Sequence, residues 1–396
     1  MHSHNHSHLP PGVRKTFPAD SDSNSSQKVP DHHKPGGGFR NPWPSFEAHG
    51  FGEAFSLFAL GNDYDSRRAA PPPPEERVPV IKPSFADIAS FHDRAKKGDA
   101  KVRATWLGHA CLFVQVGGVN VLADPCCSER CSPVQWAGPA RHRPLPCDLA
   151  DLPQIDVVLI SHNHYDHLDL PTIQRLAKLP IGSQTTYFVP LGNKRWFEKS
   201  APNVKVVEGD WWDEWEFSKS TATGAQVGAA EEEKVTVACT PCQHFSSRSI
   251  WDRDATLWSS WVVKSPNASF FFGGDTGYRA VPRSWPDPYA ELSKLPHCPA
   301  FKQIGDKYGP FDLAAVPIGA YSPRWFMSPI HCSPEDSVEL HRDIRARKSV
   351  GMHWGTFTLT DEPYWEPPQR LKAALAAHGM PEDEFVVLDI GGAVEV

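Results

Sequence analysis

The chain has 396 residues, of which 40% are hydrophobic, so it can bury one large core in a single elaborated domain or in two small ones. Its formal net charge of −7 gives no general electrostatic reason to bind nucleic acid, since proteins that bind polyanions concentrate lysine and arginine on one face. Its 39 prolines and 14 tryptophans indicate many turns and large aromatic anchors, which argues against a helical bundle or a repeat array.

Cysteine usage and apolar runs bear on where the protein works. Nine cysteines are an odd count without a small secreted framework, and no signal peptide opens the chain, which favours free thiols in a reducing compartment. No stretch approaches the roughly 20 apolar residues that a membrane-spanning helix needs. We therefore expect an intracellular, cytoplasmic protein that associates with a membrane only peripherally.

Two regions precede the expected catalytic domain. Residues 1–40 are polar and rich in histidine, proline and glycine, and we predict that they form a disordered arm. Its alternating His2, His4, His6 and His8 could bind a stray metal ion, although a solvated tail is the simpler interpretation. Residues 41–100 gather aromatic side chains, beginning with the motif NPWPSF. They predict either a lip that dips into lipid or a strap packed over the core.

From residue 101 to 396 we expect one catalytic domain. The runs ATWLGHACLFVQV and GGVNVLADP predict two strands joined by a Gly-Gly turn. Further apolar runs predict strands at 157–160, 235–239, 257–263, 270–272, 313–318, 350–352 and 385–388. Helical patterns lie at 173–178, 334–345 and 367–378. Clustered strands with helices between them indicate an α/β protein in which two sheets pack together and helices flank them.

The strongest local signal is the segment DVVLISHNHYDHLD, in which an apolar strand runs directly into His162, His164, Asp166 and His167. In an extended stretch, His162 and His164 lie on the same side and can reach one metal ion. The following turn presents Asp166 and His167 towards a second ion. Imidazole nitrogen and carboxylate oxygen are donors that zinc accepts readily.

Three later residues extend this set. His244 follows one apolar strand, Asp275 lies in the glycine-containing motif FFFGGDTG, and His353 closes the strand SVGMHW. Each alone is more often an ordinary loop residue, but together with HNHYDH they complete two metal shells. Asp124, after another early strand, is either a partner for a metal-bound imidazole or a residue that only starts a turn.

These motifs resemble the metallo-β-lactamase superfamily, whose members form an αβ/βα sandwich of two mixed β-sheets flanked by helices. WLGHA, SHNHYDHLD, FFFGGDTGY, PIGAYSPRWFM and HWGTF are similar, more closely, to the N-acyl-phosphatidylethanolamine-hydrolysing phospholipases D, from about Asn41 to the C-terminus. The resemblance implies two Zn²⁺ ions. It places His162, His164 and His244 on one ion, Asp166, His167 and His353 on the other, and Asp275 between them.

The same resemblance implies a function. Tyr165 and His331 match positions that contact the substrate in this family, although the residues before His331 depart from the family pattern. We expect hydrolysis of N-acyl-phosphatidylethanolamine to N-acylethanolamine and phosphatidic acid by a hydroxide that the two zinc ions share, with Asp166, Asp275, Tyr165 and His331 as catalytic residues. The family also implies a homodimer on a cytosolic membrane face.

Two alternatives stay open at this point. A relative within the superfamily would hydrolyse another ester or phosphodiester, whereas a lipid-binding relative would be catalytically silent. The complete ligand set argues against the silent relative, and zinc content with phosphodiesterase turnover would separate the two.

Overall fold

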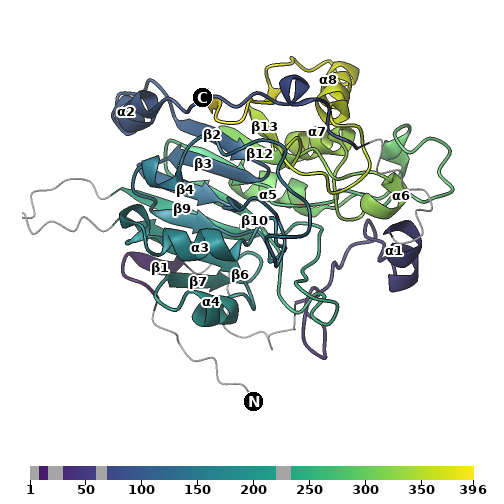
Figure 1. The fold of residues 1–396 in the computed structure, drawn as a ribbon, viewed down its shortest axis with the longest axis horizontal. Helices are drawn as coiled ribbons and strands as arrows, with labels where there is room; N and C mark the ends of the chain where they lie inside the picture. Colours follow the sequence, from purple (N-terminus) through teal and green to yellow (C-terminus); the bar gives the residue numbers. More distant parts are fainter. Residues whose placement is uncertain (1–8, 17–29, 59–68, 220–232) are drawn as a thin grey trace, which may run out of the picture.

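Two β-sheets face each other in a computed structural model that describes residues 9–16, 30–58, 69–219 and 233–396 (Figure 1). The larger sheet has eight strands in the order β1-β8-β9-β10-β11-β12-β13-β14, and the other has seven in the order β15-β2-β3-β4-β5-β6-β7. The strands of the larger sheet are β1 (Val13–Thr16), β8 (Glu214–Ser218), β9 (Lys234–Thr240), β10 (Ser260–Lys264), β11 (Ser269–Phe272), β12 (Leu313–Pro317), β13 (Ser349–Met352) and β14 (Phe385–Val386). Those of the smaller sheet are β15 (Ala393–Glu395), β2 (Val102–Gly108), β3 (Cys111–Val116), β4 (Val119–Ala123), β5 (Val157–Leu159), β6 (Thr186–Pro190) and β7 (Lys205–Gly209).

Helices flank the two sheets, and several of them cover the outer faces. They are α1 (Phe51–Phe58), α2 (Phe85–Lys96), α3 (Leu170–Leu176), α4 (Lys194–Ser200), α5 (Ala300–Tyr308), α6 (Arg324–Met327), α7 (Pro334–Asp343) and α8 (Glu366–Ala377). Apolar side chains of α2, α3 and α4 pack against the smaller sheet, and α5 and α7 pack against the larger one (Figure 1). The expected α/β architecture of two mixed sheets flanked by helices is therefore confirmed.

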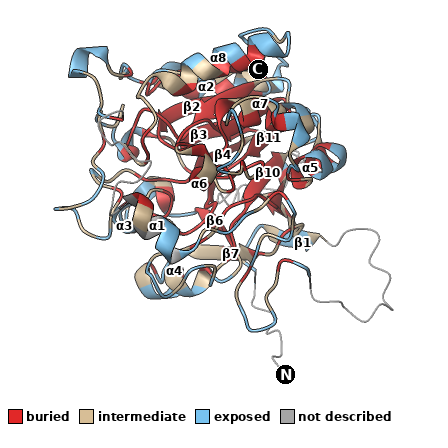
Figure 2. Ribbon diagram, turned by 90° about the vertical axis from the view of Figure 1, so that its right-hand side faces the viewer, coloured by how far each residue is buried: buried red, intermediate tan, exposed pale blue. Residues whose placement is uncertain are grey.

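The interior between the sheets is the main hydrophobic core. Figure 2 shows β2, β3, β4, β10 and β11 buried, with the exposed surface mainly on the helices and loops around them. Trp106, Trp215 and Trp261 are among the largest side chains that are fully buried. Burying a large apolar side chain contributes on the order of 1.5–3 kcal/mol. The two sheets therefore form a rigid base for the loops at their edge.

One predicted strand is in fact two. The run ATWLGHACLFVQV forms β2 and β3, which pair antiparallel, because the chain reverses at His109, where φ is 54°. Apolar residues continue on both sides of this reversal, so the pattern hid it. The expected Gly-Gly turn is present one step later, where Gly117 and Gly118, both with positive φ, join β3 to β4.

The N-terminal regions differ in part from expectation. His2, His4, His6 and His8 lie outside the described residues, but two described segments of the predicted disordered arm are structured. β1 pairs antiparallel with β8, and residues 30–40 pack on the core through His32 and Phe39. Backbone hydrogen bonds and aromatic packing stabilise segments that their polar composition alone would leave unfolded.

Within 41–100, several described side chains pack on the core. The Trp43 ring stacks on that of Trp211 at 5.3 Å, and Ser45 donates a hydrogen bond to Gln243. Leu57 of α1 is buried against Phe326 and Met327. Among the described residues, no helix combines the length and the apolar character that crossing a bilayer requires.

Candidate metal centre

The predicted ligands follow four strands that end at one edge of the two sheets. His162, His164, Asp166 and His167 come after β5 of the smaller sheet, whereas His244, Asp275 and His353 come after β9, β11 and β13 of the larger one. β11, β12 and β13 pair in parallel, so their carboxyl ends meet at the same edge. The site therefore lies where the two sheets meet.

A close approach of two loops brings the two halves of the site together. A Cβ at Gly274, where φ is +58°, would lie 2.5 Å from the Cβ of Ser161. Only glycine fits this position without displacing the β5 loop. The residue next to Gly274 is Asp275, so this contact sets how deeply the aspartate enters the site.

One cluster consists of three imidazoles. His162 Nε2 lies 2.8 Å from His164 Nδ1, and His244 Nε2 lies 3.3 Å from the same His164 atom. One nitrogen from each ring lies within 4.8 Å of the others. The three residues can therefore hold one metal ion.

A second cluster contains His109, Asp166, His167 and His353. Asp166 Oδ2 lies 3.3 Å from His167 Nε2, 3.4 Å from His353 Nε2 and 2.9 Å from His109 Nε2. This mixed set of nitrogen and carboxylate donors can hold a second ion.

Asp275 lies between the clusters. Its Oδ2 atom is 3.0 Å from both His167 Nε2 and His353 Nε2, and 3.9 Å from both His162 Nε2 and His244 Nε2. A carboxylate in this position can bind ions on both sides. The geometry thus gathers all seven predicted ligands around one shared aspartate.

Unpaired buried atoms test whether metal ions fit here. His167 Nε2, Asp275 Oδ1 and both ring nitrogens of His353 are buried without a hydrogen-bond partner. Leaving a buried polar atom unpaired costs about 1–3 kcal/mol, so several in one place need an explanation. Metal coordination would satisfy most of them, and the donor set suits a borderline divalent ion.

The electrostatics of the cluster favour ligand-competent protonation states at some ligands only. Burial, with the neighbouring histidines, holds the pKa of His162 well below its usual value and lowers the pKa of His244 to about 3. Although burial alone would raise it, His167 and His353 hold the pKa of Asp275 well below its usual value. Neutral imidazoles and ionised carboxylates are the forms that bind metal. Although burial would lower them, Asp275 and Asp166 raise the pKa of His167 well above its usual value and the pKa of His353 to about 9, so these two rings must give up a proton to bind a metal ion.

Outer residues orient the ligands. Asp124 Oδ2 lies 2.6 Å from His167 Nδ1, so Asp124 is a partner of a predicted ligand and does more than start a turn. Ser161 donates to the same carboxylate through its backbone and its hydroxyl. On the other side, His244 Nδ1 lies 2.8 Å from the carbonyl oxygen of Ile330. Such partners fix ring orientation and tautomer.

His109 is the site residue that sequence reasoning missed. It is buried at the β2–β3 reversal and its Nε2 contacts the Asp166 carboxylate. Burial, together with His353, lowers the pKa of His109 to about 3, so the imidazole is neutral and donates its N–H to Asp166. The motif WLGHA carries the signal, a histidine inside an apolar run, but an unbroken apolar run predicts one continuous strand.

The structure brings His331 into the site but orients Tyr165 towards its rim. His331 Nδ1 is buried, has no hydrogen-bond partner and lies 4.0 Å from Asp275 Oδ2. The Tyr165 hydroxyl donates to the carbonyl oxygen of Arg248 at 3.0 Å, and the Arg248 guanidinium stacks over the tyrosine ring at 4.0 Å. Tyr165 is thus tied to the loop after His244.

A cavity of about 560 Å³ opens beside the metal centre. Its lining is largely apolar and aromatic, with two arginines, and includes Phe46, Phe245, Arg248, Arg253, Phe326 and Ile330. The Phe245 ring lies 4.5 Å from that of His164 and 5.0 Å from that of His244, so one wall of the cavity touches the ligands.

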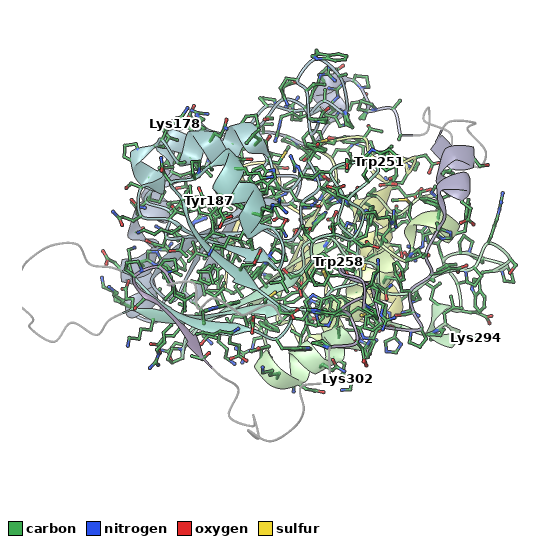
Figure 3. The ribbon with its side chains drawn as sticks, turned by 90° about the horizontal axis from the view of Figure 1, so that it is seen from below. Lys178, Tyr187, Trp251, Trp258, Lys294 and Lys302 are labelled. Atoms are coloured by element: carbon green, nitrogen blue, oxygen red, sulfur yellow. The ribbon has the colours of Figure 1, made fainter. Side chains whose placement is uncertain are left out.

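The rim of this cavity carries exposed apolar side chains. Ile250 is 77% exposed and Trp251 is 88% exposed, whereas Trp258, a little further along the chain, is buried (Figure 3). Large exposed apolar groups at a cavity mouth mark an interaction surface. We call residues 247–253 the rim loop.

Comparisons with known proteins agree with this geometry. A family model described as a beta-lactamase superfamily domain matches residues 119–354. The chain is 40% identical over 294 residues to N-acyl-phosphatidylethanolamine-hydrolyzing phospholipase D 1 of Caenorhabditis elegans, a match covering 73% of this chain and 74% of that protein. It is 30% identical over 289 residues to a mitochondrial protein of the same description from Saccharomyces cerevisiae, covering 72% of this chain and 54% of that protein.

Among solved structures, the isothiocyanate hydrolase from Delia radicum gut bacteria is 17% identical and has a TM-score of 0.50, covering 74% of this chain and 98% of that one, which shows a shared fold. The extent of the family match and the identity to the nematode protein show the family directly. The chain belongs to the metallo-β-lactamase superfamily and, within it, to the family of N-acyl-phosphatidylethanolamine-hydrolysing phospholipases D.

Proposed function

We propose that the protein is a zinc-dependent phosphodiesterase that hydrolyses N-acyl-phosphatidylethanolamine to N-acylethanolamine and phosphatidic acid. The single observation that carries this proposal is the arrangement of two donor clusters on either side of Asp275, next to a cavity lined by apolar residues. The names of the nematode and yeast relatives supply the substrate class.

Two zinc ions are the proposed cofactor. His162, His164 and His244 would hold one ion, Asp166, His167 and His353 the other, and Asp275 would bind both. Bound there, the ions would supply Lewis acidity towards the phosphodiester and activate water as a nucleophile near neutral pH. His109 and Asp124 would act on the second ion through Asp166 and His167, whose orientation they set.

His331 is the proposed proton donor or hydrogen-bond donor to the substrate. Burial keeps the pKa of His331 well below its usual value, so its neutral ring has one nitrogen that donates and one that accepts. Its unpaired Nδ1 faces the side of Asp275 where the phosphate would bind. From there the neutral ring would donate a hydrogen bond to the departing oxygen; to protonate that oxygen, the ring would first have to take up a proton itself.

Tyr165 is the proposed hydrogen-bond donor to the phosphate. Its hydroxyl would have to exchange the Arg248 carbonyl for a phosphoryl oxygen, a change of partner within the rim of the site. Stacking of Arg248 on the ring would keep the tyrosine in place during this exchange.

The rim loop supports peripheral membrane binding. Ile250 and Trp251 present apolar surface to solvent beside the cavity, and Arg248 and Arg253 line the same opening. Tryptophan and arginine together suit the boundary between lipid headgroups and acyl chains. A phospholipid would enter the cavity from a membrane held against this loop.

The homodimer stays a prediction from the resemblance. Light scattering in solution would check it.

The proposal is tested by measuring release of N-acylethanolamine from N-acyl-phosphatidylethanolamine in mixed micelles. The intact protein is compared with Asp275→Asn, which keeps the size of the side chain but removes the shared charge, and phosphatidylcholine serves as the control lipid. We expect release that requires Asp275 and ignores phosphatidylcholine.

Two other outcomes would redirect the proposal. A protein that holds two zinc ions and releases nothing would be a hydrolase of another ester or phosphodiester. A protein without bound metal and without turnover would favour the catalytically silent, lipid-binding relative.

A further inference from the structure

We propose that His32, His33 and Asp210 form a third metal site, separate from the catalytic centre, that fastens the N-terminal segment to the turn after β7. Among the described residues, the other candidate donor groups all include a residue of the catalytic centre, and this one shares none. The proposal does not depend on the reaction that the protein catalyses.

The donor atoms converge on one carboxylate. His32 Nε2 lies 2.7 Å from Asp210 Oδ1, and His33 Nε2 lies 2.7 Å from Asp210 Oδ2. The two rings meet edge to face with centroids 4.5 Å apart. All three donor atoms lie within 4.8 Å of one another, so a small adjustment of the side chains would let one ion contact each of them at about 2.0–2.2 Å.

The donor types fit a divalent transition metal. Two imidazole nitrogens with one carboxylate leave further coordination positions open, a set that binds ions such as zinc. The side chains of His33 and Asp210 are 26% and 25% exposed, so water can occupy the remaining positions. His32 is buried on the inner side. The site would thus face solvent on one side only.

Two of the three ligands are held in place by other contacts. The backbone N–H of Trp211 donates to Asp210 Oδ1 at 2.8 Å, and this fixes the carboxylate. The His32 ring stacks on Trp211 with centroids 4.2 Å apart. Ligands that are already oriented lose little freedom on binding an ion, which raises affinity.

The site would act on the cavity through the segment that it fastens. Downstream of His33, the Phe39 N–H donates to the Asp254 carbonyl, and Asn41 Nδ2 donates to the His244 carbonyl at 2.7 Å. Ser45 then bonds to Gln243, the residue before His244. An ion at His32 and His33 would therefore anchor a strap that supports the backbone of a catalytic ligand.

The experiment counts metal in the full chain. We first replace the four N-terminal histidines by alanine, because this run could bind metal without any contribution from the third site. The residues are His2, His4, His6 and His8. In this background, zinc per protein is measured after dialysis for four proteins: unchanged, His32→Ala with His33→Ala, Asp210→Asn, and Asp275→Asn. Circular dichroism verifies that each is folded, and Asp210→Asn keeps an oxygen that can accept from Trp211.

We expect the His32/His33 double variant and Asp210→Asn each to lose about one equivalent of zinc relative to the unchanged protein. When each protein is loaded with cobalt, the double variant and Asp210→Asn should lack the same visible absorption bands of the unchanged protein. Asp275→Asn should keep those bands. Equal zinc content in the unchanged protein, the His32/His33 double variant and Asp210→Asn would overturn the proposal and leave His32, His33 and Asp210 as a hydrogen-bonded contact only. Because metal is counted directly, failure to hydrolyse lipid would not affect the result.

Discussion

At the metal centre, His162, His167 and His353 are almost completely buried and follow strands of two packed sheets, whereas Ile250 and Trp251 on the rim loop project into solvent. The tip of the rim loop is held by bonds within the loop: Asp252 accepts from the backbone of Arg248 and Ser249, and Ser247 donates to the Ser249 carbonyl. The exposed tip of the rim loop, Ile250 and Trp251, can therefore change sequence without disturbing the ligands, whereas Arg248 cannot, because its guanidinium donates to the carbonyl oxygens of Asn163 and Leu168 beside them. Substitutions in the two regions should consequently affect different measurements.

The largest effect should come from removing the metal. Chelation would leave several buried imidazoles and two carboxylates facing one another without ions, so we predict that turnover falls by at least about 10³-fold and that the unfolding temperature also falls. Activity assays and calorimetry check this, and added zinc should restore both values. Full turnover in protein shown to be free of metal would contradict a metal-dependent reaction.

A smaller loss should follow from Asp124→Asn, which removes the charge that His167 Nδ1 faces at 2.6 Å. We predict that metal affinity falls about 10- to 100-fold, because an outer partner orients the ligand without binding the ion. Competition with a chromophoric chelator measures the change. Asp156→Asn is the matched control, since Asp156 is also buried and accepts a backbone hydrogen bond from Asn120 but lies away from the ligands. Equal effects of the two variants would reduce Asp124 to a residue that only supports the fold.

His331→Ala and Tyr165→Phe should each lower turnover about 10- to 100-fold while metal content stays constant. Each would remove one hydrogen bond to a charged phosphate, an interaction of about 1.5–3 kcal/mol. Steady-state kinetics with metal analysis checks both variants. Tyr187→Phe, in the buried strand β6, controls for the loss of a phenol elsewhere. Unchanged turnover in either variant would remove that residue from the catalytic set.

The smallest effect should appear at the rim. We predict that Trp251→Ala weakens binding to phospholipid vesicles about fivefold, because one side chain loses part of its contact with lipid, and that metal content does not change. Sedimentation with vesicles measures this. Trp136→Ala is the matched control, since Trp136 is similarly exposed but lies outside the rim loop. Equal weakening by both substitutions would assign membrane binding to general surface hydrophobicity.

The contrast between the metal centre and the rim loop also explains which features could be predicted from sequence. HNHYDH, His244, Asp275 and His353 each follow an apolar strand, and a strand end is visible as an abrupt change from apolar to polar residues. Helices α7 and α8 were also visible, because their apolar residues recur at helical spacing.

Features that depend on long-range contact were hidden. His109 lies at a reversal inside an unbroken apolar run, and its partner Asp166 is far along the chain. The structured parts of the N-terminal arm depend on β8 and on Asp210, which local composition cannot reveal. Likewise, nothing near Tyr165 in sequence indicates that its hydroxyl bonds to Arg248.

The distribution of ligands over both sheets also constrains biosynthesis. His162 follows β5, but Asp275 and His353 follow β11 and β13, which a ribosome produces much later. A nascent chain that has reached β5 can offer only part of each donor set, and partial sets bind metal weakly and without selectivity. The centre can be completed only after β13 has been synthesised and has docked, so metal loading must be one of the last steps in maturation of this enzyme.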